Sequence, residues 1–191
     1  MLKGLFGGKK SEAQRGEDTV WISHAARRQG IAREVAALAE AERSVVVVAL
    51  TLPALDELET ALSAHQPVRC ADIFAKDGLR LNLSRTGAVA IALSGALPLD
   101  LKPGPDIGVD VIVYGRSDTR AADDAIVRFA DSLGPNAHVT FHLSLEDRLL
   151  QDFGGPIKPL LEKLGLSPQE PITHSMVTRS IRNAQEEKKG G

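Results

Sequence analysis

One segment constrains the fold more than any other. Residues 44–50 read SVVVVAL, an unbroken run of apolar and mostly β-branched side chains. The run has the length of a strand and is much shorter than a transmembrane helix. Because side chains alternate between the two faces of a strand, a strand that is apolar throughout is covered on both faces. The segment therefore predicts a central strand of a mainly parallel sheet.

Similar strands alternate with helix-like segments along the chain. Further strands are predicted at residues 19–22, 68–74, 88–93, 109–114 and 138–143. Apolar residues at helical spacing predict helices at residues 31–38, 51–62 and 118–133. The alternation of Leu79, Leu81 and Leu83 favours another strand, and the three prolines and three glycines of residues 94–108 predict a loop. Right-handed crossovers between such elements produce a three-layer α/β sandwich.

Two of these helices carry start signals. Thr51 is expected to cap the helix at residues 51–62, with Pro53 in its first turn. Its buried stripe is expected to consist of Leu52, Leu55, Leu58 and Leu62. Ser144 is expected to cap a short helix after the last strand, with Asp147 completing a capping box.

The chain of 191 residues suffices for one domain with an appendage. We expect residues 1–17 to form a flexible tail, because three large apolar side chains cannot offset the entropy of ordering it. Residues 18–155 then form the α/β domain, and residues 156–191 form a helical extension.

The composition narrows the possible functions. A net charge of −2 argues against a nucleic-acid partner. The single cysteine, Cys70, excludes an internal disulfide. No run of residues is long and apolar enough to span a membrane, and the N-terminus lacks the features of a signal peptide. We therefore expect a cytoplasmic protein.

Several blocks in the last third of the chain carry a family resemblance. Residues 141–155 read FHLSLEDRLLQDFGG, and residues 161–187 read LEKLGLSPQEPITHSMVTRSIRNAQEE. Both resemble the end of the second nucleotide-binding domain of the SecA preprotein-translocation ATPase family. The matched blocks, in the order found in the family, are residues 144–147, 164–166, 170–174 and 183–185. Several blocks in order are far more specific than one short motif.

The middle of the chain is collinear with the same domain of SecA. Residues 87–92 resemble the Gly-Ala-Val-Thr-Ile-Ala strand that precedes the family's motif V. Residues 44–51 resemble the strand and helix that open the domain. Over residues 18–187 the resemblance implies a RecA-like α/β domain of the helicase C-terminal type, followed by the start of the SecA scaffold. Residues 1–7 also resemble the start of SecA proteins, which implies weak peripheral contact with the inner face of the membrane.

The chain departs from the family at the residues that hydrolyse ATP. Residues 4–11 lack the spacing of a P-loop and belong to the tail. Residues 93–100 read LSGALPLD where motif V should read Thr-Asn-Met-Ala-Gly-Arg-Gly-Thr-Asp. Residues 125–134 read AIVRFADSLG where motif VI should read Gln-Leu-Arg-Gly-Arg-Ser-Gly-Arg-Gln-Gly. Without gaps, Phe129 and Ser132 replace the finger arginines; a shift by one residue would place Arg128 near a finger position, but the glycines of the motif would still be absent. Because losing an arginine finger costs orders of magnitude in rate, we expect a pseudo-ATPase with no catalytic residues.

Three arginines are the candidates for any remaining nucleotide contact. Arg116, Arg120 and Arg128 follow the strand at residues 109–114, whose C-terminal end lies where open α/β sheets bind ligands. ATP is the cofactor they would contact, and otherwise no cofactor is expected. The five histidines and Cys70 lack metal-ligand spacing, so no metal site is expected. Cys70 is interpreted as a buried apolar residue rather than a nucleophile.

Five other charged residues receive structural interpretations. Arg27 and Arg28 are expected on a solvated helix face. Asp106, Asp110 and Asp118 are expected around the C-terminal end of a central strand, either as loop and cap residues or as part of a ligand site.

Three functions follow from the resemblance. The first is a non-catalytic accessory or regulatory module of protein translocation, which binds a partner such as a full-length SecA or the translocation channel. The second is a protein that contributes half of a nucleotide site in trans to a SecA-type ATPase. The third is an unrelated protein-interaction module on a reused fold.

Overall fold

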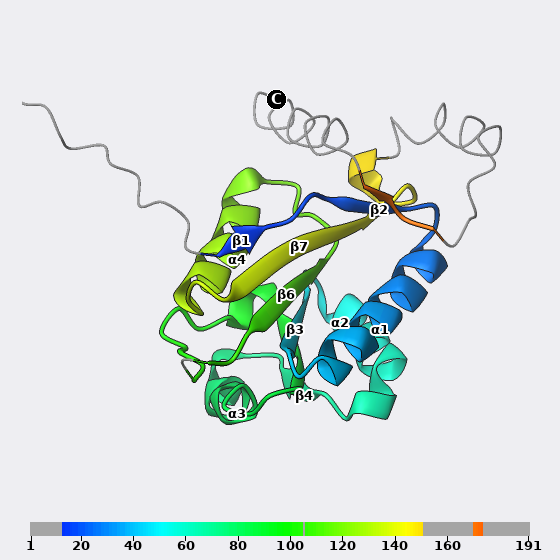
Figure 1. Cartoon of the computed structure of the whole chain (residues 1–191). Coiled ribbons are helices and arrows are strands. Elements are labelled where there is room, and N and C mark those ends of the chain that lie inside the picture. The colour runs from blue at the N-terminus through cyan, green and yellow to red at the C-terminus, as the bar shows by residue number, and fades with distance from the viewer. Residues whose placement is uncertain (1–12, 105, 151–169, 174–191) are drawn as a thin grey trace, which may run out of the picture.

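The computed structural model describes residues 13–104, 106–150 and 170–173. Strands in this part of the chain form one sheet in the order β4-β5-β3-β6-β7-β2-β8, with β1 pairing β7 beside that path (Figure 1). The pairings are parallel, except that β8 runs antiparallel to β2. The strands are β1 (Gln14–Arg15), β2 (Thr19–Trp21), β3 (Ser44–Ala49), β4 (Val68–Cys70), β5 (Val89–Leu93), β6 (Val109–Tyr114), β7 (Ala137–Ser144) and β8 (Ile172–Thr173).

Helices cover both faces of this sheet. The α-helices of the described residues are α1 (His24–Glu40), α2 (Leu52–Ala61), α3 (Lys76–Asn82) and α4 (Arg120–Ser132). Ile31 of α1 and Leu55 of α2 belong to one apolar core, whereas Leu79 of α3 and Phe129 of α4 belong to the core on the other face. The predicted three-layer, mainly parallel α/β architecture is confirmed, and it is consistent with a RecA-like domain.

Strand β3 joins the two cores, as its sequence predicted. Val45 and Val47 lie in the core with α1 and α2, and Val46 and Val48 lie in the core with α3 and α4. All four side chains are fully buried. Parallel pairing with β5 on one side and β6 on the other satisfies the backbone of β3 along its length.

Helix α2 begins as expected, but one residue of its predicted stripe is exposed. The Thr51 hydroxyl accepts a hydrogen bond from the Ala54 backbone N–H at 3.4 Å. Leu55, Leu58 and Leu62 are fully buried, whereas Leu52 is 52% exposed. Two successive steps of three residues rotate Leu52 about 120° away from Leu58 on a helix with 3.6 residues per turn, which turns Leu52 out of the buried stripe.

The strand predicted from Leu79, Leu81 and Leu83 is wrong, because this segment forms α3. Leu79 and Leu83 lie four residues apart, so a helix places both on one face, and both are fully buried. Leu81 lies on the opposite side and is 73% exposed. The preceding strand is also shorter than predicted. It ends at Cys70, because the Asp72 carboxylate accepts hydrogen bonds from the backbone N–H groups of residues 74 and 75 and starts a 3-10 turn.

The sheet begins within the segment that was expected to be a tail. Gln14 and Arg15 form β1 and pair with His138 and Val139 of β7. Of the predicted helical extension, the structure describes residues 170–173, which include β8. The expectations for residues 1–12, 151–169 and 174–191 lie outside the described residues. None of the described helices is long and apolar enough to cross a membrane.

Candidate functional site

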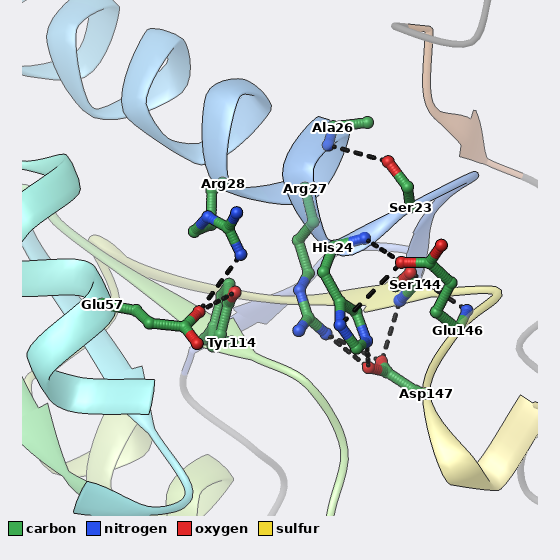
Figure 2. Close-up of polar contacts among 10 residues, drawn as sticks. All are labelled: Ser23, His24, Ala26, Arg27, Arg28, Glu57, Tyr114, Ser144, Glu146 and Asp147. Atoms are coloured by element: carbon green, nitrogen blue, oxygen red, sulfur yellow. Dashed lines mark hydrogen bonds and ion pairs between the residues drawn. The ribbon is translucent and has the colours of Figure 1, made fainter. Parts of the chain in front are cut away.

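Polar side chains gather where β2, β6 and β7 end. Trp21, the last residue of β2, pairs with Ser144, the last residue of β7, so the two strands stop at the same edge. Figure 2 shows the side chains that meet there from the start of α1 and from the turn after β7. We call this group the strand-end cluster: Ser23, His24, Arg27, Ser144, Glu146 and Asp147. Open parallel sheets bind ligands at this edge.

Arg27 is the centre of the strand-end cluster. Its Nη1 donates to both carboxylate oxygens of Asp147, at 2.9 and 2.8 Å, and its guanidinium carbon lies 3.8 Å from the centre of the Tyr114 ring (Figure 2). Arg27 is 5% exposed, so the prediction that it lies on a solvated face is wrong. The first turn of α1 lies over the strand ends, where a carboxylate and an aromatic face offset the cost of burying the charge.

The turn after β7 uses the two residues predicted to form a capping box. The Ser144 backbone N–H donates to Asp147 Oδ2 at 2.8 Å, and the Ser144 hydroxyl accepts from the Glu146 N–H at 3.1 Å. The Asp147 half of the predicted capping box is therefore present, whereas the Ser144 hydroxyl bonds residue 146 and the Asp147 N–H donates to the Ser144 carbonyl oxygen, which closes a turn. A 3-10 helix over Arg148–Leu150 follows.

The same turn is tied to the start of α1. Ser23 caps α1 by accepting from the Ala26 N–H at 3.1 Å. The His24 backbone N–H donates to Glu146 Oε2 at 2.8 Å, and His24 Nε2 lies 3.0 Å from Asp147 Oδ1. Two carboxylates at a helix N-terminus also interact favourably with the helix dipole. The cluster therefore joins the turn after β7 to the start of α1.

Arg28 lies beside the cluster and is more exposed than Arg27. Its Nη1 donates to Glu57 Oε2 at 3.3 Å, and the Tyr114 hydroxyl donates to the same oxygen at 3.1 Å (Figure 2). The Arg28 side chain is 36% exposed. These contacts connect α1, α2 and the end of β6.

Arg116, the first candidate for nucleotide contact, is locked inside the domain. Its Nη1 donates to Asp123 Oδ2 at 2.9 Å, and its Nη2 makes a short hydrogen bond to Asp18. The guanidinium carbon lies 3.9 Å from the centre of the Phe141 ring. With 2% of its side chain exposed, Arg116 holds together the end of β6, the start of α4 and the residue before β2 rather than facing solvent.

The other two candidate arginines lie on the outer surface of α4. Arg120 is exposed and its Nε lies 3.9 Å from Asp124 Oδ2, and Arg128 is exposed eight residues further on. Eight residues correspond to about 12 Å along a helix. The three arginines are therefore not brought into one site, and a nucleotide contact by Arg120 or Arg128 stays a prediction.

The positions aligned with the finger arginines belong to the body of α4. Phe129 is fully buried in the core between α4 and the sheet. The Ser132 hydroxyl donates to the Phe129 carbonyl oxygen at 2.7 Å within the same helix. Helix α4 therefore continues to Ser132 through the segment that the resemblance assigns to motif VI.

Cys70 has the surroundings of a core residue. It is fully buried at the end of β4, and burial, together with the nearby Asp72 charge, raises the pKa of its thiol. A thiol that resists deprotonation is a poor nucleophile. Among the described residues, no group of three or more histidine, cysteine, aspartate or glutamate side chains could hold a metal ion.

The prediction that Asp110 lies at the C-terminal end of a central strand is wrong. It is the second residue of β6, so it lies near the amino end of that strand, where it forms a short ion pair with Arg43 and lies 3.4 Å from His138. The error came from treating the three aspartates as one group. Only Asp118 follows the carboxyl end of the strand.

The comparisons with known proteins identify the relatives of the chain. No protein-family model matches it. It is 29% identical over 189 residues to the protein translocase subunit SecA of Desulfotalea psychrophila, covering 91% of this chain and 22% of that protein. It is 36% identical over 132 residues to the SecA of Helicobacter pylori strain Shi470, covering 66% of this chain and 15% of that protein. The chain is related to SecA. It spans about a fifth of the length of these relatives.

The comparison with solved structures finds partial matches in shape. The C-terminal part of the Fun30 ATPase domain matches with a TM-score of 0.49 and 12% identity, covering 86% of this SecA-related chain and 54% of that one. T4 UvsW matches with the same score and identity, covering 70% of this chain and 32% of that one. The fold assignment given above rests on the sheet order and the layers themselves.

Sequence reasoning missed the ion pairs that organise the strand ends. Asp18 and Arg116 are separated by 98 residues, and Arg27 and Asp147 by 120. No periodicity or short motif links residues so far apart. One general rule could have indicated these pairs. The carboxyl ends of parallel strands share one edge of the sheet, so charged residues that follow the predicted strands are expected to lie near one another.

Proposed function

We propose that this SecA-related chain is a non-catalytic accessory module of protein translocation that binds a partner protein. The observation that carries the non-catalytic part of the proposal is the identity of two residues of α4. Where the family resemblance requires the two finger arginines, this chain has a buried Phe129 and a Ser132 bonded within the helix. Transfer of a phosphoryl group relies on such cations to neutralise the developing charge.

The ion pairs of Arg116 support the same proposal. Releasing this guanidinium towards a nucleotide would leave Asp18 and Asp123 buried, with 1% and 3% of their side chains exposed. Breaking a buried pair in this way costs about 3–5 kcal/mol. A nucleotide would have to supply that energy before any net binding appeared.

The strand-end cluster supports the partner-binding part of the proposal. It holds the turn at residues 144–147, which is the first of the SecA-like blocks and leads into the remaining ones. A block that is held in one conformation before a partner binds lowers the entropy cost of binding. The partner is a full-length SecA or a component of the translocation channel, and the complex forms on the cytoplasmic side of the membrane.

The experiment is a pull-down of the full chain, tagged at its N-terminus, from the cells that make it, combined with an ATPase assay of the purified chain. We expect SecA or a channel component to co-purify and the isolated chain to show no ATP hydrolysis. An unrelated α/β domain with the same tag serves as the control. Recovery of one unrelated partner would instead identify an interaction module on a reused fold, and hydrolysis by the isolated chain would overturn the non-catalytic assignment.

A second function is favoured by the exposure of Arg120 and Arg128 on α4. Either guanidinium could complete a nucleotide site of a SecA-type ATPase in trans. In that case Arg120→Ala or Arg128→Ala should reduce the ATPase rate of a mixed complex by at least about tenfold. Arg80→Ala is the matched control, because Arg80 is an exposed arginine on another helix that pairs with Asp100. Unchanged rates in both α4 variants would exclude this function.

A further inference from the structure

A pocket lies on the α1 side of the sheet, at the end opposite to the strand-end cluster. Its volume is about 300 Å³. We call it the Glu34 pocket; it is lined by Gln14, Arg15, Gly16, Glu34, Asp110, Val111, His138 and Thr140. These residues come from β1, β6, β7 and α1, so four rigid elements form its walls. Neither the SecA relationship nor the proposed function assigns a role to this pocket.

His142 lies next to the pocket and beside the Glu34 carboxylate. Trp21 Nε1 donates to His142 Nδ1 at 3.2 Å, and because an indole nitrogen can only donate, Nδ1 must accept. Burial, and secondarily the charge of Arg27, lowers the pKa of His142 to about 4, so its ring is neutral at pH 7. The single ring proton therefore lies on Nε2, which is 3.4 Å from Glu34 Oε2. Nε2 is also 3.4 Å from Thr140 Oγ1, so this neutral N–H donates to the Thr140 hydroxyl and lies beside the Glu34 carboxylate.

The charge of Glu34 lacks a compensating cation. Among the described residues, no lysine or arginine nitrogen lies within 4.0 Å of this carboxylate, whose side chain is 38% exposed, and the adjacent His142 ring is neutral. Burial and the negative charge of Asp110 raise the pKa of Glu34, as expected for a carboxylate that a cation would stabilise. Asp110 has Arg43 as its own partner, so that arginine offsets Asp110 rather than Glu34.

Arg15 belongs to the lining of the pocket, but its guanidinium lies over the ring of Phe141. Its guanidinium carbon lies 5.5 Å from the centre of the Phe141 ring. Phe141 belongs to the core on the α4 side of the sheet, whereas His142 faces α1, since adjacent residues of a strand point to opposite faces. The charged groups that face the pocket from α1, β6 and β7 are Glu34, Asp110 and His138. This arrangement disfavours an anion and, because no metal-binding group is present among the described residues, also a metal ion.

We infer that the Glu34 pocket binds an organic cation that carries N–H groups, such as the side chain of a lysine or an arginine from another polypeptide, with the Glu34 carboxylate as the anchor. The N–H groups of the ligand would donate to Glu34, and the Thr140 hydroxyl and the Gln14 side chain offer further polar contacts at the wall. The volume accommodates a side chain of this size. The inference does not depend on the proposed function.

The test is a titration of the full chain with n-butylammonium chloride and, separately, n-propylguanidinium chloride, followed by NMR. Trp21 is the single tryptophan of the chain, so its indole N–H signal is unambiguous, and it is linked to Glu34 through His142. We expect saturable shifts of this signal with at least one cation. Glu34→Gln should weaken binding at least about tenfold, because a hydrogen bond to a charged group is lost. Glu40→Gln removes an exposed carboxylate from the same helix and should leave binding unchanged.

Three outcomes would overturn the inference. The first is the absence of saturable shifts with both cations. The second is equal binding by the wild type and Glu34→Gln, with both proteins shown to be folded by circular dichroism. The third is an equal response to n-butanol or to sodium chloride at matched concentration, which would indicate an apolar pocket or general screening instead of a cation site.

Discussion

Two regions along the same side of the sheet place a charged residue of α1 in different surroundings. In the strand-end cluster, Arg27 is paired with Asp147 through both carboxylate oxygens and covered by Tyr114. In the Glu34 pocket, a carboxylate that is 38% exposed lines an open volume and lies 3.4 Å from a neutral histidine. Both residues belong to α1 and are two turns apart, so they lie on the same face of the helix. Charges that are paired internally hold the fold together, whereas a charge without a cation beside a cavity is available to a ligand.

The largest expected effect concerns the most completely paired charge. Arg116→Met would remove the cation that pairs with the buried Asp18 and Asp123, and we expect a loss of about 3–5 kcal/mol in the free energy of unfolding. Urea denaturation of the purified chain measures it. Arg120→Met, which removes an exposed arginine four residues further on, should change the stability by less than about 0.5 kcal/mol. Similar losses of stability in the two variants would contradict the conclusion that the buried ion pairs of Arg116 stabilise the fold more than an exposed arginine does.

His142 is expected to make the stability depend on pH. Its pKa is lowered from 6.5 to about 4 in the folded protein, so the unfolded chain takes up a proton at a higher pH than the folded one. The stability is therefore fully present above pH 6.5 and decreases as the pH falls towards 4, by up to about 3 kcal/mol. Thermal unfolding between pH 7 and pH 4 measures this decrease.

Two variants test whether His142, and not another histidine, causes this pH dependence of the stability. His142→Gln retains an acceptor for the Trp21 indole N–H but does not titrate, so the decrease in stability should become smaller. His65→Gln, on the 3-10 turn after α2, should leave the pH dependence unchanged. A decrease of the same size in the His142→Gln protein would remove His142 as its source.

The next effect tests the strand-end cluster. Arg27→Met removes the pair with Asp147 and the contact with the Tyr114 ring, and we expect a loss of about 2 kcal/mol. This is smaller than for Arg116, because the Asp147 side chain is 19% exposed and water can solvate it. Arg28→Met removes a neighbouring arginine that is 36% exposed and should cost less than about 1 kcal/mol. If both substitutions cost the same, the cluster would not be the anchor of this edge.

The smallest effect is expected in the Glu34 pocket, and it has the opposite sign. Because the pKa of Glu34 is raised in the folded protein, its ionised form opposes folding at neutral pH, and this unfavourable contribution disappears as the pH falls below the pKa of the unfolded chain. Glu34→Gln should therefore stabilise the protein at pH 7 by a few tenths of a kcal/mol. The gain should vanish at low pH. A loss of stability at pH 7 would show that Glu34 has a structural role.

The local pattern of apolar residues was sufficient to predict most of the strands of the sheet. The strands at residues 44–50, 88–93 and 109–114 were predicted because uniformly apolar, β-branched runs have few alternatives in a folded chain. The prediction failed for residues 79–83, where three leucines fit both a period of two and a helix. In the structure, the burial of Leu79 and Leu83 against the sheet selects the helix.

The candidate sites were decided by tertiary structure. The sequence determined that the chain would form a parallel sheet covered on both faces, and that the SecA-like motifs for phosphoryl transfer are replaced, since both are written in consecutive residues. It did not determine that Arg116 would form buried ion pairs with Asp18 and Asp123, or that Glu34 would line a cavity. Those outcomes depend on which strands become neighbours. A parallel sheet brings together residues about a hundred positions apart, and the balance between desolvation and pairing is set only there.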